Sequence, residues 1–103
     1  MRRLRGFLAE RGGRASNAEL AREVGLSEGW FSHAFKRTTG KTPLQWQQEQ
    51  RISAVKECLL HEDLTIAEIA LRFDFSDQGH LTRVFRRHAG ITPSAWRREA
   101  RAR

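Results

Sequence analysis

The stretch TIAEIALRFDFSDQGHLTRVFRR, residues 65–87, decides the fold class of this 103-residue chain. Apolar residues at helical spacing predict a short amphipathic helix over residues 66–73. A tight turn is expected at Asp74 and Phe75, and a second helix begins after Ser76 and ends in a run of arginines. This order of elements is typical of a helix-turn-helix whose second helix is basic.

Most of this stretch repeats a pattern that occurs about fifty residues earlier. Ser16 and Glu19 form a capping box in the first copy, as Thr65 and Glu68 do in the second. The offset between the copies is 49 residues as far as Ser76 and 50 beyond the turn. Along the shared register, Leu20, Ala21, Val24, Leu26, Ser27, Phe31, Phe35, Arg37, Gly40, Thr42, Pro43 and Trp46 correspond to Ile69, Ala70, Phe73, Phe75, Ser76, Leu81, Phe85, Arg87, Gly90, Thr92, Pro93 and Trp96.

The first half of the chain reads as three short helices, over residues 2–11, 17–24 and 28–39. Gly25 allows the left-handed backbone that the turn between the second and third requires. Leu26 is expected to plug that turn, Ser27 to cap the third helix, and Gly12 and Gly13 to end the first.

A longer helix is expected over residues 43–61, opened by Thr42, Pro43 and Gln45. At about 18 residues it should be roughly 27 Å long. Successive major grooves on one face of DNA are about 34 Å apart. The helix is therefore interpreted as a spacer that holds the two helix-turn-helix units at about the distance between successive grooves.

The charge balance favours a polyanionic partner. Nineteen Lys and Arg residues against 12 Asp and Glu give a net charge of +7 and a pI near 11.2. Nucleic acid is the first candidate and an anionic membrane surface the second. The single cysteine, Cys58, excludes an internal disulfide, provides no metal-ligand pair and favours a reducing, cytoplasmic location.

The paired units, the segment RISAVKECLL, the run at residues 65–87 and the closing GITPSAW together resemble the DNA-binding domain of AraC/XylS-type bacterial transcription regulators. The resemblance implies an all-α fold of about seven helices, with two homeodomain-like helix-turn-helix subdomains at residues 1–42 and 62–103 joined by a linker helix at 43–61. It further implies a cytoplasmic protein that binds double-stranded promoter or operator DNA, with one recognition helix in each of two successive major grooves, and contacts RNA polymerase. For this domain alone it implies a monomer, and a dimer where it is part of a longer regulator.

The same resemblance places base contacts on both recognition helices, at Gly29, Ser32, His33, Gln78, Gly79, His80, Thr82 and Arg83. Arg83 can donate two hydrogen bonds to guanine, and Gln78 can pair with adenine. Because the first copy has His33 where the second has Arg83, we expect the second helix to contribute more affinity. Residues better suited to phosphate are Lys36, Arg37, Arg86 and Arg87.

Other interpretations stay open beside this one. A helix-turn-helix can serve as a protein-interaction module or bind polyanions without sequence preference. An enzyme is not expected, because no nucleophile and base recur at plausible spacing, and no cofactor or metal site is indicated. The remaining expectations are a core role for Cys58, Trp46 and Trp96, a surface position for His61, His88 and Trp30, and a fraying basic tail at RREARAR, residues 97–103.

Overall fold

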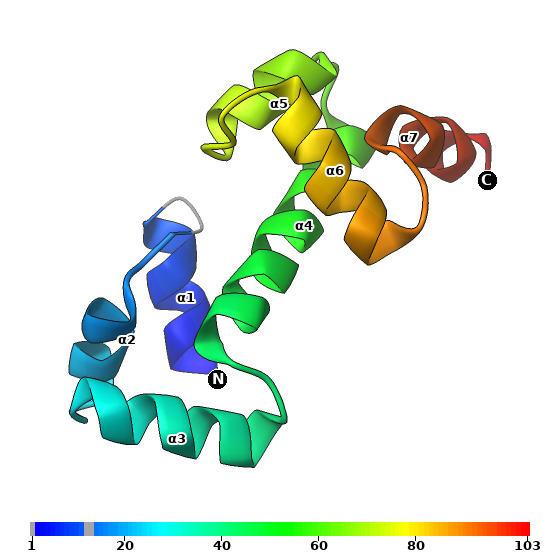
Figure 1. Ribbon diagram of the computed structural model, residues 1–103. Helices are drawn as coiled ribbons and strands as arrows, with labels where there is room; N and C mark the ends of the chain where they lie inside the picture. Colours follow the sequence, from blue (N-terminus) through cyan, green and yellow to red (C-terminus); the bar gives the residue numbers. More distant parts are fainter. Residues whose placement is uncertain (1, 12–13) are drawn as a thin grey trace. The chain divides into compact units, whose positions relative to one another are not determined.

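The computed structural model describes residues 2–11 and 14–103, and over these residues it contains seven α-helices and no strand (Figure 1). The all-α prediction is therefore confirmed. The predicted stop at Gly12 and Gly13 lies outside the described residues. The helices are α1 (Arg2–Glu10), α2 (Asn17–Glu23), α3 (Glu28–Thr39), α4 (Pro43–His61), α5 (Ile66–Arg72), α6 (Gln78–Ala89) and α7 (Pro93–Ala102).

The chain divides into two compact units, Met1–Gln50 and Arg51–Arg103. The division falls inside α4, the predicted long helix, which is 19 residues long. Its first half therefore contributes to the core of the first unit and its second half to the core of the second.

The core of the first unit is built around an aromatic cluster. Phe35 lies 5.5 Å from Phe31 and 5.6 Å from Trp46 between ring centroids. The side chain of Gln47 donates to the backbone oxygen of Ala15 at 2.6 Å and accepts from its N–H at 3.2 Å. This pair fixes the segment that leads into α2. Buried with the aromatic rings are Leu4, Leu8, Leu20 and Ala21.

The core of the second unit is larger and includes an edge contact between Phe85 and Trp96. Phe85 is fully buried and meets Trp96 at 6.2 Å, and Trp96 itself is half-buried at the margin of the core. Cys58 is buried, as predicted. The other buried members are Ile52, Val55, Leu59, Ile69, Ala70, Phe75, Leu81 and Val84.

Both helix-turn-helix turns share one backbone geometry. Gly25 has φ 73° and Asp74 has φ 63°, so the aspartate adopts the left-handed conformation that the glycine adopts in the first copy. Each turn is closed by an equivalent backbone hydrogen bond of 2.9 Å. The Leu26 N–H donates to the Ala21 oxygen in the first turn, and the Phe75 N–H donates to the Ala70 oxygen in the second. Leu26 is 37% exposed whereas Phe75 is 4% exposed. The predicted plug is therefore present in the second turn, and the prediction for Leu26 is wrong.

Several predicted boundaries shift by one residue. Val24 and Phe73 are the C-caps of α2 and α5 instead of their last helical residues. Ser27 caps α3, but the cap of α6 is Asp77, whose Oδ1 accepts the His80 N–H at 2.7 Å. The correspondence of Ser76 with Ser27 predicts a cap at Ser76, and that prediction is wrong. The residue added in the second copy is Ser76, and the Asp77 carboxylate performs the capping one position later.

The closing segment is helical, so the prediction of a fraying tail is wrong. Arg97 and Arg101, on α7, both donate to the backbone oxygens of Leu59 and Glu62, at 2.7–3.2 Å. The last carbonyl groups of a helix have no partner within it. These two arginines supply partners to the C-terminal end of α4 and so join α7 to it.

Candidate nucleic-acid interface

The outward face of α3 follows directly from its buried face. Phe31 and Phe35, four residues apart, turn into the core. Helical spacing then directs the opposite side to solvent. Gly29, His33, Lys36 and Arg37 are exposed, and Ser32 is half-buried at the edge of this face.

Four of the predicted contact residues line one open hollow of about 530 Å³ in the first unit, which we call the α3 hollow. Ser32, His33, Lys36 and Arg37 form its α3 side. Asn17 at the start of α2 and Thr42, Pro43 and Leu44 at the start of α4 complete it. Gly29 is not among the lining residues.

Two contacts orient side chains on α3. Asn17 Nδ2 donates to Ser32 Oγ at 3.2 Å, so the serine hydroxyl accepts from α2 and keeps its own proton for donation. The His33 ring stacks on Trp30, with centroids 5.8 Å apart and 29° between the planes. Trp30 is 57% exposed, as expected. His33 is thus held against an aromatic surface on the same helix.

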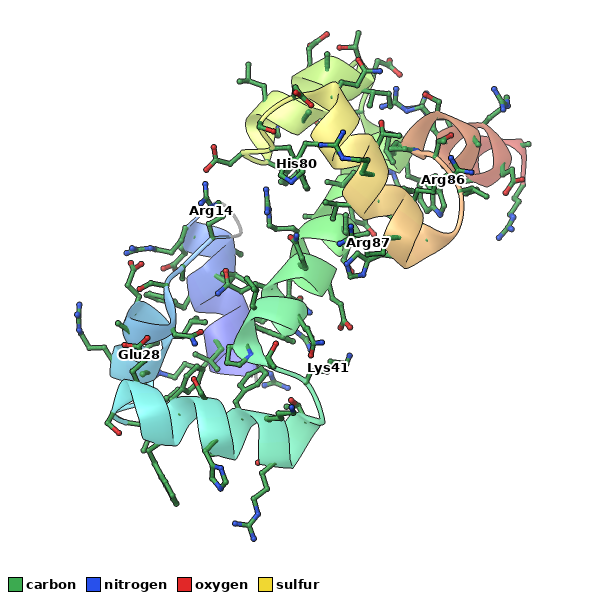
Figure 2. All side chains as sticks on the ribbon, in the orientation of Figure 1. Arg14, Glu28, Lys41, His80, Arg86 and Arg87 are labelled. Atoms are coloured by element: carbon green, nitrogen blue, oxygen red, sulfur yellow. The ribbon has the colours of Figure 1, made fainter. Side chains whose placement is uncertain are left out.

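On α6 the buried residues Leu81, Val84 and Phe85 leave a basic outward row. Gly79, Arg83, Arg86 and Arg87 are exposed; Arg83 lies four residues after Gly79, and Arg86 and Arg87 lie three and four residues after Arg83, so all four share one side of the helix. Gln78, the first residue of α6, is exposed too, and Thr82 is half-buried. Figure 2 shows His80 near the start of α6, and Arg86 and Arg87 further along it.

His80 takes part in the turn. Its Nδ1 accepts the Ser76 N–H at 3.2 Å, and its ring meets Phe75 edge-on at 5.3 Å. The neutral ring that accepts at Nδ1 carries its proton on Nε2. Only the Nε2 side is then available to an outside partner.

Gly79 leaves space beside Arg83. A Cβ at Gly79 would lie 3.5 Å from Arg83 Nη1 and 3.3 Å from Asp77 Oδ1. The guanidinium therefore lies over the first turn of α6, close to its capping carboxylate. Gly29, the equivalent residue of α3, has no such neighbour within 4 Å.

Arg51 supports the second turn from α4, and sequence reasoning missed it. Its Nη2 donates to the backbone oxygen of Phe73 at 2.6 Å, and its guanidinium lies 4.0 Å from the ring centroid of Phe75. It is 9% exposed. The available signal was an arginine among the apolar positions of the long helix, a place where charge is rare unless it is paired.

An ion pair ties α5 to the end of α4 in the second unit. Arg72 Nη1 donates to both carboxylate oxygens of Glu62, at 3.0 and 2.9 Å. These hydrogen bonds hold the pKa of Glu62 below its ordinary value. Burial, with the neighbouring Glu62 carboxylate, raises the pKa of the Cys58 thiol. Cys58 is therefore a core residue without thiolate character.

The part of the chain that the structure describes contains neither a metal-binding cluster nor a membrane-spanning helix. No group of three or more His, Cys, Asp or Glu side chains among them is placed to hold a metal ion. Nor does any helix in residues 2–11 and 14–103 have the length and apolar character needed to cross a membrane.

Comparison with known proteins finds relatives over most of the chain. A family described as "Helix-turn-helix domain" matches residues 20–99. The Arabinose operon regulatory protein of Escherichia coli K12 is 36% identical over 67 residues, which are 65% of this chain and 23% of that protein. The chain thus spans about a quarter of the length of such curated relatives.

Solved structures match over nearly the whole chain. The DNA-binding domain of AdpA, a global transcriptional factor solved in complex with a target DNA, is 30% identical, with a TM-score of 0.82, 96% of this chain covered and 90% of that one. An AraC-type transcriptional regulator from Chromobacterium violaceum is 27% identical, with a TM-score of 0.82 and coverage of 86% and 80%.

Proposed function

Because this chain belongs to the AraC-type helix-turn-helix family, we propose that it binds double-stranded DNA sequence-specifically and regulates transcription. The observation that carries the proposal is the exposed basic row of α6, set on a capped and plugged turn. The same fold in AdpA is solved with a target DNA, at 30% identity over 96% of this chain. α3 and α6 are then the two recognition helices, one in each major groove.

The side chains of α6 divide by chemistry. Gln78 and Arg83 are the proposed base readers, since amide and guanidinium groups can each make two hydrogen bonds to one base edge. Arg86 and Arg87 follow one turn later and are proposed to hold phosphates. Thr82 and the Nε2 side of His80 are secondary candidates, because Thr82 is half-buried and His80 Nδ1 is already engaged.

α3 is proposed to position the protein more than it selects the site. Ser32 and His33 offer single hydrogen bonds, and Gly29 offers none from a side chain. Lys36 and Arg37 are proposed phosphate ligands. An asymmetric binding site follows, with more specificity in the half that contacts α6.

The wider setting is also a proposal. Contact with RNA polymerase, activation of transcription, a cytoplasmic location and a monomeric state for this domain are what the family suggests. The chain spans about a quarter of the length of its curated relatives. We therefore propose that it acts together with an effector-binding or dimerising domain.

Selection from a random duplex library tests the proposal. The expected result is one enriched asymmetric motif, bound at least about 10³-fold more tightly than scrambled duplex at the same salt concentration. Binding that is steeply salt-dependent but equal for all duplexes would identify a nonspecific polyanion-binding module instead.

A further inference from the structure

The α3 hollow contains an apolar side chain that packing does not require there. Leu44, the second residue of α4, is 70% exposed, although Trp46 two residues later is 3% exposed. A single exposed leucine is ordinary on a protein surface. Its neighbours decide whether it has a role.

Those neighbours combine apolar and cationic groups. Pro43 lies beside Leu44 in the lining, and Lys36 and Arg37 project from α3 on the other side. The start of α4 is closed by its own capping box, in which Thr42 and Gln45 exchange hydrogen bonds at 2.9 and 3.1 Å. The hollow therefore places a well-ordered apolar surface, formed by Pro43 and Leu44, next to the exposed cations of Lys36 and Arg37.

We infer that the α3 hollow is a seat for the sugar-phosphate backbone of one DNA strand, in which Leu44 packs against a deoxyribose and Lys36 and Arg37 bind the flanking phosphates. This inference rests on the proposed function and deepens it. Charge complementarity supports this occupant, since a backbone strand alternates an apolar sugar face with an anion. Continuity supports it too, because Ser32 and His33 of the proposed recognition helix line the same hollow.

The second copy shows that the fold does not need a leucine at this place. Fifty residues later the same Thr-Pro start is followed by Ser94, with Thr92 Oγ1 accepting the Ala95 N–H at 3.2 Å. Ser94 is exposed at the start of α7. Leu44→Ser thus imports a residue that an equivalent helix start already carries.

The test compares Leu44→Ser with Leu71→Ser, which removes a leucine that is 81% exposed on α5, outside the hollow. Affinity of the whole chain is measured for a mixed-sequence duplex over a range of salt concentrations. Leu44→Ser should bind about fivefold more weakly at every salt concentration, as expected for losing part of a leucine's apolar contact. The salt slope should not change, because no phosphate contact is lost. Leu44→Met, which keeps an apolar side chain, should bind within about twofold of wild type.

Lys36→Ala provides the contrasting signature. It should reduce the magnitude of the salt slope by about one, the amount for one phosphate contact. The inference is overturned if Leu44→Ser binds like wild type, if it changes the salt slope, or if Leu71→Ser loses as much affinity. Failure of the wild-type chain to bind any duplex overturns the proposed function and the seat together, whereas normal wild-type binding with an unaffected Leu44→Ser overturns the seat alone.

Discussion

Replacement of Arg51 by alanine should destabilise the second unit more than any surface substitution. The side chain is 9% exposed, donates to Phe73 O at 2.6 Å and covers the ring of Phe75. A hydrogen bond from a charged donor contributes about 1.5–3 kcal/mol. A desolvated cation–π contact contributes about 2 kcal/mol. Allowing for relaxation, the free energy of unfolding should fall by about 3 kcal/mol.

Chemical and thermal denaturation followed by circular dichroism measures this change. A loss of about 3 kcal/mol corresponds to a melting temperature at least about 12 °C lower in a domain of this size. Arg51→Lys keeps the charge but not the flat guanidinium, so it should lose about half as much. Arg98→Ala, at an exposed position of α7, is the matched control and should stay within about 0.5 kcal/mol of wild type.

The result also bears on function, because the turn that Arg51 supports sets the start of α6. At a temperature where the variant is still folded, the preference for the enriched duplex should weaken along with the turn. An Arg51→Ala protein that unfolds within about 1 kcal/mol of wild type would show that these two contacts are energetically unimportant, and the account of the second turn would be wrong.

The remaining predictions concern recognition, helix propensity and pH. In competition assays, Arg83→Ala should relax selectivity at one base pair and cost about 1–3 kcal/mol of binding free energy. Arg87→Ala should instead weaken binding to all duplexes alike and flatten the salt slope. An equal loss of selectivity in both variants would contradict this division of roles. Gly29→Ala should raise stability by up to about 1 kcal/mol in denaturant titrations, because a Cβ there meets no atom within 4 Å. Arg72 lowers the pKa of Glu62, so the ion pair stabilises the fold above the ordinary glutamate pKa, and this stability is lost as the pH falls through the lowered pKa. Glu62→Gln should therefore reduce the dependence of the unfolding free energy on pH in the acid range. The same acid dependence in the variant and in wild type would refute this prediction.

Much of the fold could be predicted because its signals are local. The capping boxes at Ser16 and Thr65, the left-handed glycine at 25 and the Thr-Pro starts depend on residues within four positions of one another, and the structure has them where the pattern indicated. The boundary errors at Val24 and Phe73 are of one residue. Ser76 was misassigned as the cap of α6 because serine and aspartate are both preferred caps and here they are adjacent. The sequence alone does not show which of the two is the added residue.

Apart from the local bonds of His80 to Asp77 and Ser76, the contacts that sequence reasoning missed join residues far apart in the chain. Arg51 reaches Phe73, Arg97 and Arg101 reach the end of α4, and Asn17 holds Ser32. Each of these side chains is long or polar enough to serve many partners, so residue type alone does not identify the one it meets. The division of roles along α3 and α6 stays a prediction on the same ground, since it depends on which bases and phosphates the side chains face.

By itself the sequence determined that this protein is a pair of capped helix-turn-helix units with basic second helices, because caps, turns and apolar periodicity act over a few residues. Only the tertiary structure decided which side chains are available for recognition. Long-range packing buries Arg51 against the second turn and ties Arg97 and Arg101 to the C-terminal end of α4. Packing around α3 leaves Leu44 exposed beside the cations of the α3 hollow. Such choices depend on long-range contacts, whose partners no local pattern specifies.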